Sequence, residues 1–150
     1  MNNEYRISKL RDYLFTVINT LTENRNYQIN ANMLSDKIDD YSIDKIPAES
    51  EVQRFITGES LHRDVYSFRS RKAYSKDTIN NLKNIGFFEL FEDAIDNNNK
   101  NRVLPDITGI QSISCLNCGT MVSTTDGNKA EFDIQIQIEY IKERGELWKR

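Results

Sequence analysis

Residues 130–140, AEFDIQIQIEY, carry the most regular pattern in the chain and decide the fold class. Apolar residues from Ala130 to Tyr140 alternate with acidic and amide residues at every position. Successive side chains of a β-strand point to opposite faces of a sheet, so this period of two predicts a long strand with one buried and one solvated face. The alternation places Ile136 in the core and its neighbour Gln135 in water.

Shorter segments are expected to extend this strand into a sheet. They are residues 37–47 (KIDDYSIDKIP), 51–57 (EVQRFIT), 60–70 (SLHRDVYSFRS), 107–115 (ITGIQSISC) and 120–125 (TMVSTT). Pro47 ends the first of them, because proline has no N–H to donate to a strand partner. Gly58 and Glu59 predict a hairpin turn between the second and third, and Asp126 with Gly127 predicts a tight turn before the long strand.

One helix is expected over residues 5–21, where apolar residues recur at steps of three and four. The stripe consists of Ile7, Leu10, Leu14, Val17, Ile18 and Leu21. The polar stretch after Leu21, which contains Asn26, predicts its end.

A second helical segment is expected to begin at Ser75, whose hydroxyl is a suitable N-cap, with Asp77 in the first turn. Its apolar positions are Ile79, Leu82, Ile85, Phe87, Phe88, Phe91 and Ile95. Gly86 interrupts them, which predicts two short helices that meet at residues 84–86, or one helix bent there. Residues 96–102, DNNNKNR, predict a solvated loop.

These elements predict one α+β domain over residues 1–150, with an N-terminal helix and a central helical segment packed on a mixed or antiparallel sheet. The N-terminus lacks the apolar run of a signal peptide, and no apolar stretch reaches the ~20 residues that span a bilayer. We therefore expect a protein of the reducing cytoplasm that does not enter a membrane. Its net charge of −3 gives no overall attraction to nucleic acid.

The Cys-x-x-Cys spacing of Cys115 and Cys118 is typical of zinc knuckles and of redox sites. A structural zinc site needs four ligands, whereas the only histidine, His62, is distant in sequence. Redox pairs depend on a helix N-terminus, and this pair lies in β-rich sequence. We interpret both cysteines as small residues near a bend between strands, and we expect no metal and no cofactor.

Strand alternation in residues 60–70 places Leu61, Val65 and Ser67 on one face and Ser60, His62, Asp64, Tyr66 and Phe68 on the other. Ser60, His62 and Asp64 share a face by default, and catalytic triads are recognised by geometry rather than by such spacing. No phosphate-binding glycine loop and no zinc-protease motif occurs. We expect no enzymatic activity.

Charged side chains gather in two segments. The basic ones are Arg54, Arg63, Arg69, Arg71, Lys72 and Lys76, with aromatic neighbours Phe55, Tyr66, Phe68 and Tyr74. The acidic ones, Glu89, Glu92, Asp93 and Asp96, lie on the second helical segment. Basic and aromatic residues together are typical of single-stranded nucleic-acid binding. A solvated or protein-facing surface is the alternative, because Glu59, Asp64 and Asp77 dilute the positive charge.

Several motifs resemble a group of small tail terminator proteins of Firmicutes phages and prophages. They are Ile-Pro-x-Glu at residues 46–49, F-x-S-R-x-x-Y-S at 68–75, S-K-D-T-I followed by G-F-F-E-x-F within 75–91, LPDI at 104–107, and the alternating strand that ends in Tyr140. The resemblance covers roughly residues 44–141. The chain departs from the family pattern at Cys115–Gly119, where a bulky residue is expected, and near Ala94, where a tryptophan is expected.

The resemblance implies a lambdoid tail-terminator-like subunit that forms a hexameric ring. Such a ring caps the tail tube, stops its polymerisation and joins the tail to the neck of the head. The implied partners are other copies of the chain, the tail tube protein, the sheath where a tail has one, and the head–tail connector. DNA would pass through the lumen without specific binding. The implied location is the tail–neck junction of the virion, after assembly in the host cytoplasm.

A ring built from one repeated contact needs two different complementary surfaces on each subunit. The expected interface residues are Arg54, Phe55, Arg63, Arg69 and Arg71 on the basic hairpin, and Glu92 and Asp96 on the acidic helix. Two alternatives stay open from the sequence. The first alternative is another neck ring protein, such as a connector stopper or adaptor. The second is a small nucleic-acid-binding protein.

Overall fold

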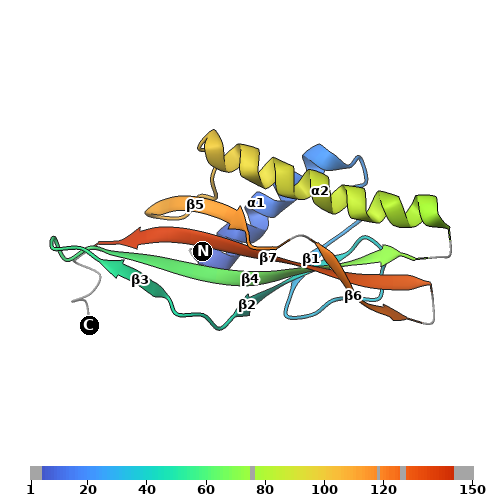
Figure 1. Ribbon diagram of the computed structural model, residues 1–150, viewed down its shortest axis with the longest axis horizontal. Helices are drawn as coiled ribbons and strands as arrows, with labels where there is room; N and C mark the ends of the chain where they lie inside the picture. Colours follow the sequence, from blue (N-terminus) through green and yellow to red (C-terminus); the bar gives the residue numbers. More distant parts are fainter. Residues whose placement is uncertain (1–4, 75–76, 118, 126–127, 144–150) are drawn as a thin grey trace.

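Two long antiparallel strands, β4 (Ser60–Ala73) and β7 (Lys129–Lys142), form the centre of the sheet (Figure 1). The computed structural model describes residues 5–74, 77–117, 119–125 and 128–143. Within these residues the fold is α+β, with two helices and a seven-stranded mixed sheet, as the sequence predicts. The other elements are α1 (Arg6–Leu21), β1 (Ile29–Ala31), β2 (Tyr41–Ile46), β3 (Glu51–Arg54), α2 (Thr78–Lys100), β5 (Ile110–Cys115) and β6 (Thr120–Thr125).

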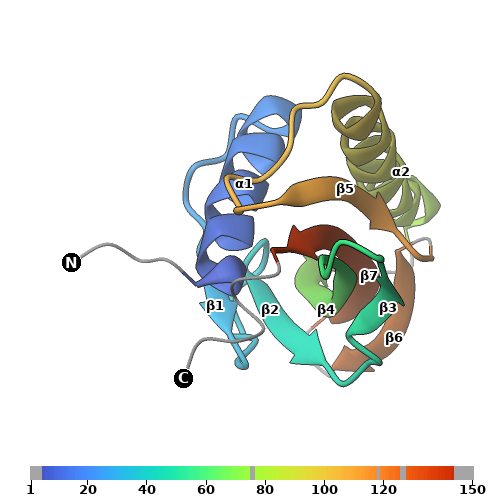
Figure 2. The same ribbon diagram turned by 90° about the vertical axis from the view of Figure 1, so that its left-hand side faces the viewer.

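Each central strand has two short strands along its outer edge. β2 and β3 pair with different parts of β4, and β5 and β6 pair with different parts of β7. These pairs are antiparallel, whereas β1 adds to β2 in parallel. Both helices lie on the same side of the sheet (Figures 1 and 2). The expected strands are therefore confirmed. The turn expected at Asp126 and Gly127 lies outside the described residues, although β6 and β7 pair on either side of it.

The alternation of β7 is confirmed residue by residue. Every second side chain, from Ala130 to Tyr140, is buried against the helices, and Ile136 is fully buried. The intervening residues, Gln135 among them, are half-buried on the opposite face. α1 confirms its expected stripe, with Leu10, Leu14, Val17 and Ile18 in the core. Tyr13, which the stripe omits, is also buried, and its hydroxyl donates to the carbonyl of Val103 at 2.9 Å.

α2 is one continuous helix, which agrees with the expected alternative of a single helix and excludes two separate ones. It corrects the expected loop at residues 96–102, since it includes much of that stretch. Its N-cap is Asp77, whose carboxylate accepts from the Ile79 N–H at 3.0 Å, whereas Ser75 lies outside the described residues. The asparagine-rich end stays helical because Asn99 is engaged. Its side-chain oxygen accepts from the N–H of Ile113 on β5 at 2.9 Å.

The apolar residues of α2 have two different environments. Phe88, Phe91 and Ile95 are buried, which fixes the C-terminal half of the helix on the sheet. Ile79 and Leu82, which belong to the expected apolar stripe, are instead exposed. Neither described helix combines the length and the apolar composition needed to cross a membrane.

Candidate functional site

The residues expected to form a basic hairpin surface lie in two separate places. Arg54 and Arg63 lie at the β3–β4 end of the sheet. Arg54 donates through Nη2 to Oε1 of Glu51 at 2.7 Å, and Arg63 donates through Nε to the carbonyl of Glu49 at 3.1 Å. Glu59 lies in the same turn. Arg54 is therefore paired with a carboxylate and Arg63 with a backbone carbonyl. Phe55, half-buried, closes the turn through its N–H, which donates to the carbonyl of Glu59 at 2.8 Å.

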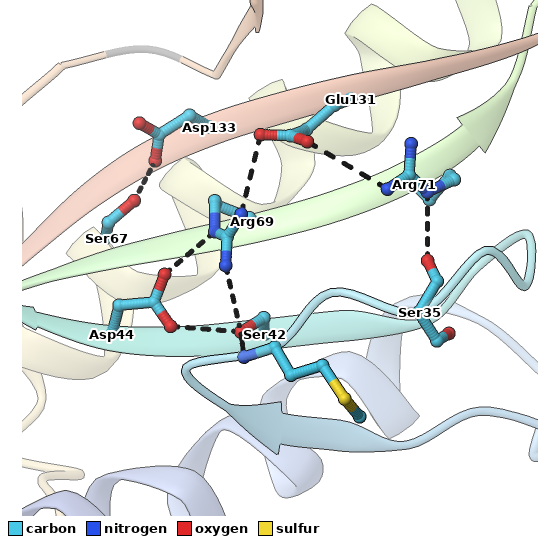
Figure 3. A network of polar contacts seen from close by, with 9 residues as sticks. Ser35, Ser42, Asp44, Ser67, Arg69, Arg71, Glu131 and Asp133 are labelled. Carbon is cyan, nitrogen blue, oxygen red and sulfur yellow. Dashed lines mark hydrogen bonds and ion pairs between the residues drawn. The ribbon is translucent and has the colours of Figure 1, made fainter. Parts of the chain in front are cut away.

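Arg69 lies further along β4, inside a network of opposite charges on the sheet face that the helices leave open (Figure 3). Its Nε is 2.8 Å from Oδ2 of Asp44 on β2, and its Nη1 is 3.7 Å from Oε2 of Glu131 on β7. Arg71 lies beside it, donates through Nε to the carbonyl of Ser35 at 2.9 Å, and is 4.0 Å from the same glutamate. The charges of both arginines are thus compensated within the subunit.

The pairing of β4 with β7 explains this network. It places Arg63 opposite Glu139, Arg69 opposite Asp133 and Arg71 opposite Glu131. Cross-strand neighbours of opposite charge stabilise a sheet. The alternation of residues 130–140 predicts acidic residues on the solvated face of the last strand, but it carries no information on which strand lies beside them. Glu131 and Asp44 are therefore residues of this site that the sequence reasoning missed.

The basic and aromatic residues that suggested nucleic-acid binding do not share a surface. Tyr66 and Phe68 are in the core, because they belong to the helix-covered face of β4. Lys72 is also buried, with its ammonium 4.1 Å from the ring centre of Phe87 and 3.1 Å from the hydroxyl of Tyr41, to which it donates. Burial lowers the pKa of Lys72, although the nearby carboxylate of Asp39 opposes the shift. Bases cannot stack on the buried rings of Tyr66 and Phe68, whereas Phe55 and Tyr74 are half-buried.

Ser60, His62 and Asp64 share the helix-covered face, as expected, but Ser60 and His62 form one hydrogen-bond set and Asp64 belongs to another. Ser60, which is fully buried, lies with its hydroxyl 2.7 Å from Nε2 of His62, and the hydroxyl of Ser50 is 3.1 Å from Nδ1. Burial and the charge of Lys142 lower the pKa of His62.

Asp64 instead ties the sheet to α1. Its carboxylate accepts from Nε of Arg6 at 2.7 Å and from the hydroxyls of Tyr66 and Tyr140, each at 3.1 Å. Burial alone would raise the pKa of Asp64, but Arg6 and Lys45 hold it below its ordinary value. This arrangement stabilises the packing of α1 and leaves the carboxylate away from the imidazole ring.

The acidic face of α2 lies beside the cysteine segment. Cys115 is a half-buried free thiol at the end of β5, and its burial, Glu92 and Asp96 raise its pKa to about 12. Cys118 lies outside the described residues. Glu92 accepts from the N–H of Gly119, and Asp96 forms an exposed ion pair with Lys100 at 3.0 Å. Among the described residues, no cluster of three or more histidine, cysteine or acidic side chains can hold a metal ion.

Large apolar side chains are exposed next to this acidic face. They are Ile79, Leu82, Ile85 and Leu90 on α2, and Met121 and Val122 on the edge strand β6. A groove of about 420 Å³ separates the two elements. Its lining consists of Tyr74, Asn81, Ile85, Gly119, Met121 and Phe132. We call these lining residues the α2–β6 groove.

Comparison with models of protein families and with curated proteins finds no match to this chain. The candidate sites therefore rest on the geometry above. Three features make up this geometry. They are the charge-compensated sheet face around Arg69, the β3–β4 turn at one end of the sheet, and the apolar α2–β6 groove at the other end.

Proposed function

We propose that the chain is a structural virion protein that forms a hexameric ring, caps the tail tube, terminates its polymerisation and joins the tail to the head. The motifs quoted from residues 46–140 support this proposal, since they resemble those of phage tail terminators. The α+β fold is compatible with it. Another neck ring protein is the nearest alternative, and it shares the requirement for self-assembly.

The observation that carries the proposal is the exposed apolar surface on α2 and β6. Ile85 and Met121 line one groove, and Ile79, Leu82 and Val122 are each about half exposed or more. Single exposed apolar residues are ordinary, but an apolar groove with further exposed apolar residues on the same two elements is a common feature of protein–protein contacts. This apolar surface would be buried if the subunit assembled with other subunits.

The charged residues expected at the interface take different roles in this account. Arg54, Arg63, Glu92 and Asp96 have side chains at the surface or partly exposed and remain candidates for setting register between subunits. Arg69 pairs internally with Asp44 and Glu131, so its reversal would disturb the sheet before it tested any contact.

Tail length provides the test of this function. Deleting the chain from the phage or prophage that encodes it should leave tail tubes of uncontrolled length in electron micrographs, and supplying it in trans should restore uniform tails. Gene order is a second test, since a terminator is expected just upstream of the sheath or tube genes. Normal joined tails in the deletion would contradict the proposal. Empty heads that lack a closed neck, with tails of normal length, would assign the chain to the neck instead.

A further inference from the structure

The turn between β3 and β4 presents an apolar side chain that no residue in the described part of its own subunit covers. Ile56 has a relative exposure of 106%, the largest among the exposed apolar residues of the described chain. The turn around it is well defined, because the N–H of Gly58 donates to the carbonyl of Phe55 at 3.0 Å, and Gly58 takes a φ of 95°. An isoleucine held at the tip of an ordered hairpin would bury most of its apolar surface if a partner covered it.

The two elements that flank the α2–β6 groove, β6 and the N-terminal half of α2, lie at the opposite end of the molecule from this turn (Figure 1). The central strand β4 separates the turn from the groove, since it begins at Ser60 just after the turn and ends at Ala73 next to Tyr74 of the groove. A strand of this length spans roughly 40 Å at about 3.3 Å per residue. Ile56 therefore cannot reach the groove of its own subunit, and any contact between them joins two copies.

Charge at the two surfaces is locally complementary. Arg54 lies two residues before Ile56, and its side chain is 52% exposed. Its ion pair with Glu51 is solvent-exposed, and such pairs contribute little, so Arg54 can exchange partners. On the other surface, Glu89 is exposed one helical turn after Ile85, and no ion-pair partner lies near it in the described part of the chain.

From these observations we infer that the β3–β4 turn of one subunit inserts Ile56 into the α2–β6 groove of a second copy, with Arg54 facing Glu89. The contact joins different surfaces, so it repeats from copy to copy, and it closes into a ring where the rotation between subunits allows. This inference rests on the proposed ring and gives it a specific contact, yet it is measured on the purified chain alone, without tails.

Analytical ultracentrifugation over a range of concentrations up to about 1 mM tests the contact, since a complex with a Kd near 1 mM is well populated there. The unmodified chain should associate, and its average mass should rise with concentration. Ile56→Ser and Ile85→Glu change exposed side chains, so both variants should keep the unfolding transition of the parent chain. Each should bind itself about 10- to 100-fold more weakly, as loss of one buried isoleucine predicts. Val103→Ser, at an exposed apolar position outside both surfaces, is the matched control and should associate normally.

A mixture of the two variants distinguishes this contact from a symmetric one. Ile56→Ser keeps an intact groove and Ile85→Glu keeps an intact turn, so the mixture should form a complex of one copy of each and grow no further. A parent chain that stays monomeric at about 1 mM would overturn the inference. So would variants that associate like the parent, or a mixture that forms no complex. A confirmed contact together with normal tails in the deletion strain would leave this inference standing and remove the proposed function.

Discussion

The backbone of Gly119 lies directly against the ring of Phe88, so close that a Cβ atom added to the glycine would be 2.6 Å from Cγ of the phenylalanine. Gly119 precedes β6, and Phe88 is a fully buried residue of α2. This close contact packs the end of the β5–β6 connection against α2.

Two glycine-to-alanine substitutions should have opposite effects on stability. Gly119→Ala should destabilise the subunit by about 1–3 kcal/mol, because the new methyl group overpacks the Phe88 ring. Gly86→Ala should stabilise it by about 0.5–1 kcal/mol, because no atom lies within 4 Å of the new Cβ and alanine is the better helix former. Urea unfolding measures both. Equal effects of the same sign would show that the packing at Gly119 or the helix at Gly86 is wrongly described.

Adjacent positions of β7 should respond very differently to a charge. Ile136 is fully buried, so Ile136→Asp places an unpaired carboxylate in the core and should prevent folding. Gln135→Asp, on the half-buried opposite face, should fold with a much smaller loss of stability. Circular dichroism melting curves compare the variants. Curves that coincide would mean that the register of β7 is wrong.

The single histidine should make stability depend on pH as the pH falls below the ordinary histidine pKa of 6.5. The folded-state pKa of His62 lies below its ordinary value of 6.5, so the unfolded chain binds a proton that the folded chain rejects. The free energy of unfolding should therefore fall as pH drops below 6.5, by at most about 1.4 kcal/mol per pH unit.

His62→Gln should remove this slope, which urea unfolding at several pH values measures. Glu92 cannot produce the same trend, because its raised pKa makes the folded state bind the extra proton and gives a slope of opposite sign. A slope that persists unchanged in the His62→Gln variant would contradict the assignment.

Cys115 should be unreactive in the folded subunit. Burial and nearby carboxylates raise its pKa to about 12, so almost no thiolate is present at neutral pH, and the thiolate is the reactive form. In a Cys118→Ser variant, labelling of the remaining thiol by a disulfide reagent should be slow and should become fast in urea. Labelling at the rate of a free cysteine, or zinc bound in one-to-one ratio by the unmodified chain, would show that the cysteine segment is a site.

Local patterns in the sequence predicted local structure well. The alternation of residues 130–140 and the stripe of residues 5–21 each depend only on neighbouring positions, and both elements are found at nearly the expected bounds. The sequence left open whether α2 is one helix or two, because Gly86 weakens helix propensity. The tertiary contacts of Phe88 and Phe91 hold it together as one helix.

The candidate site was harder to predict from the sequence, because it depends on which strands pair. β4 and β7 are separated by more than 50 residues in sequence, and only their pairing brings Glu131 beside Arg69. Likewise, the sequence showed apolar residues at Ile79 and Leu82, but their exposure follows from where α2 extends beyond its contacts with the core. A local sequence pattern predicts neither the contact between Arg69 and Glu131 nor the exposure of Ile79 and Leu82.

The proposed function is tested most directly by the mass of assemblies under native conditions, measured on the purified chain with and without tail tubes from the phage or prophage that encodes it. The account predicts one hexameric ring at a tube end, little binding along the tube wall, and no salt-dependent affinity for DNA. A chain that stays monomeric with tubes, coats their length, or binds DNA with an affinity that falls as salt rises would contradict it.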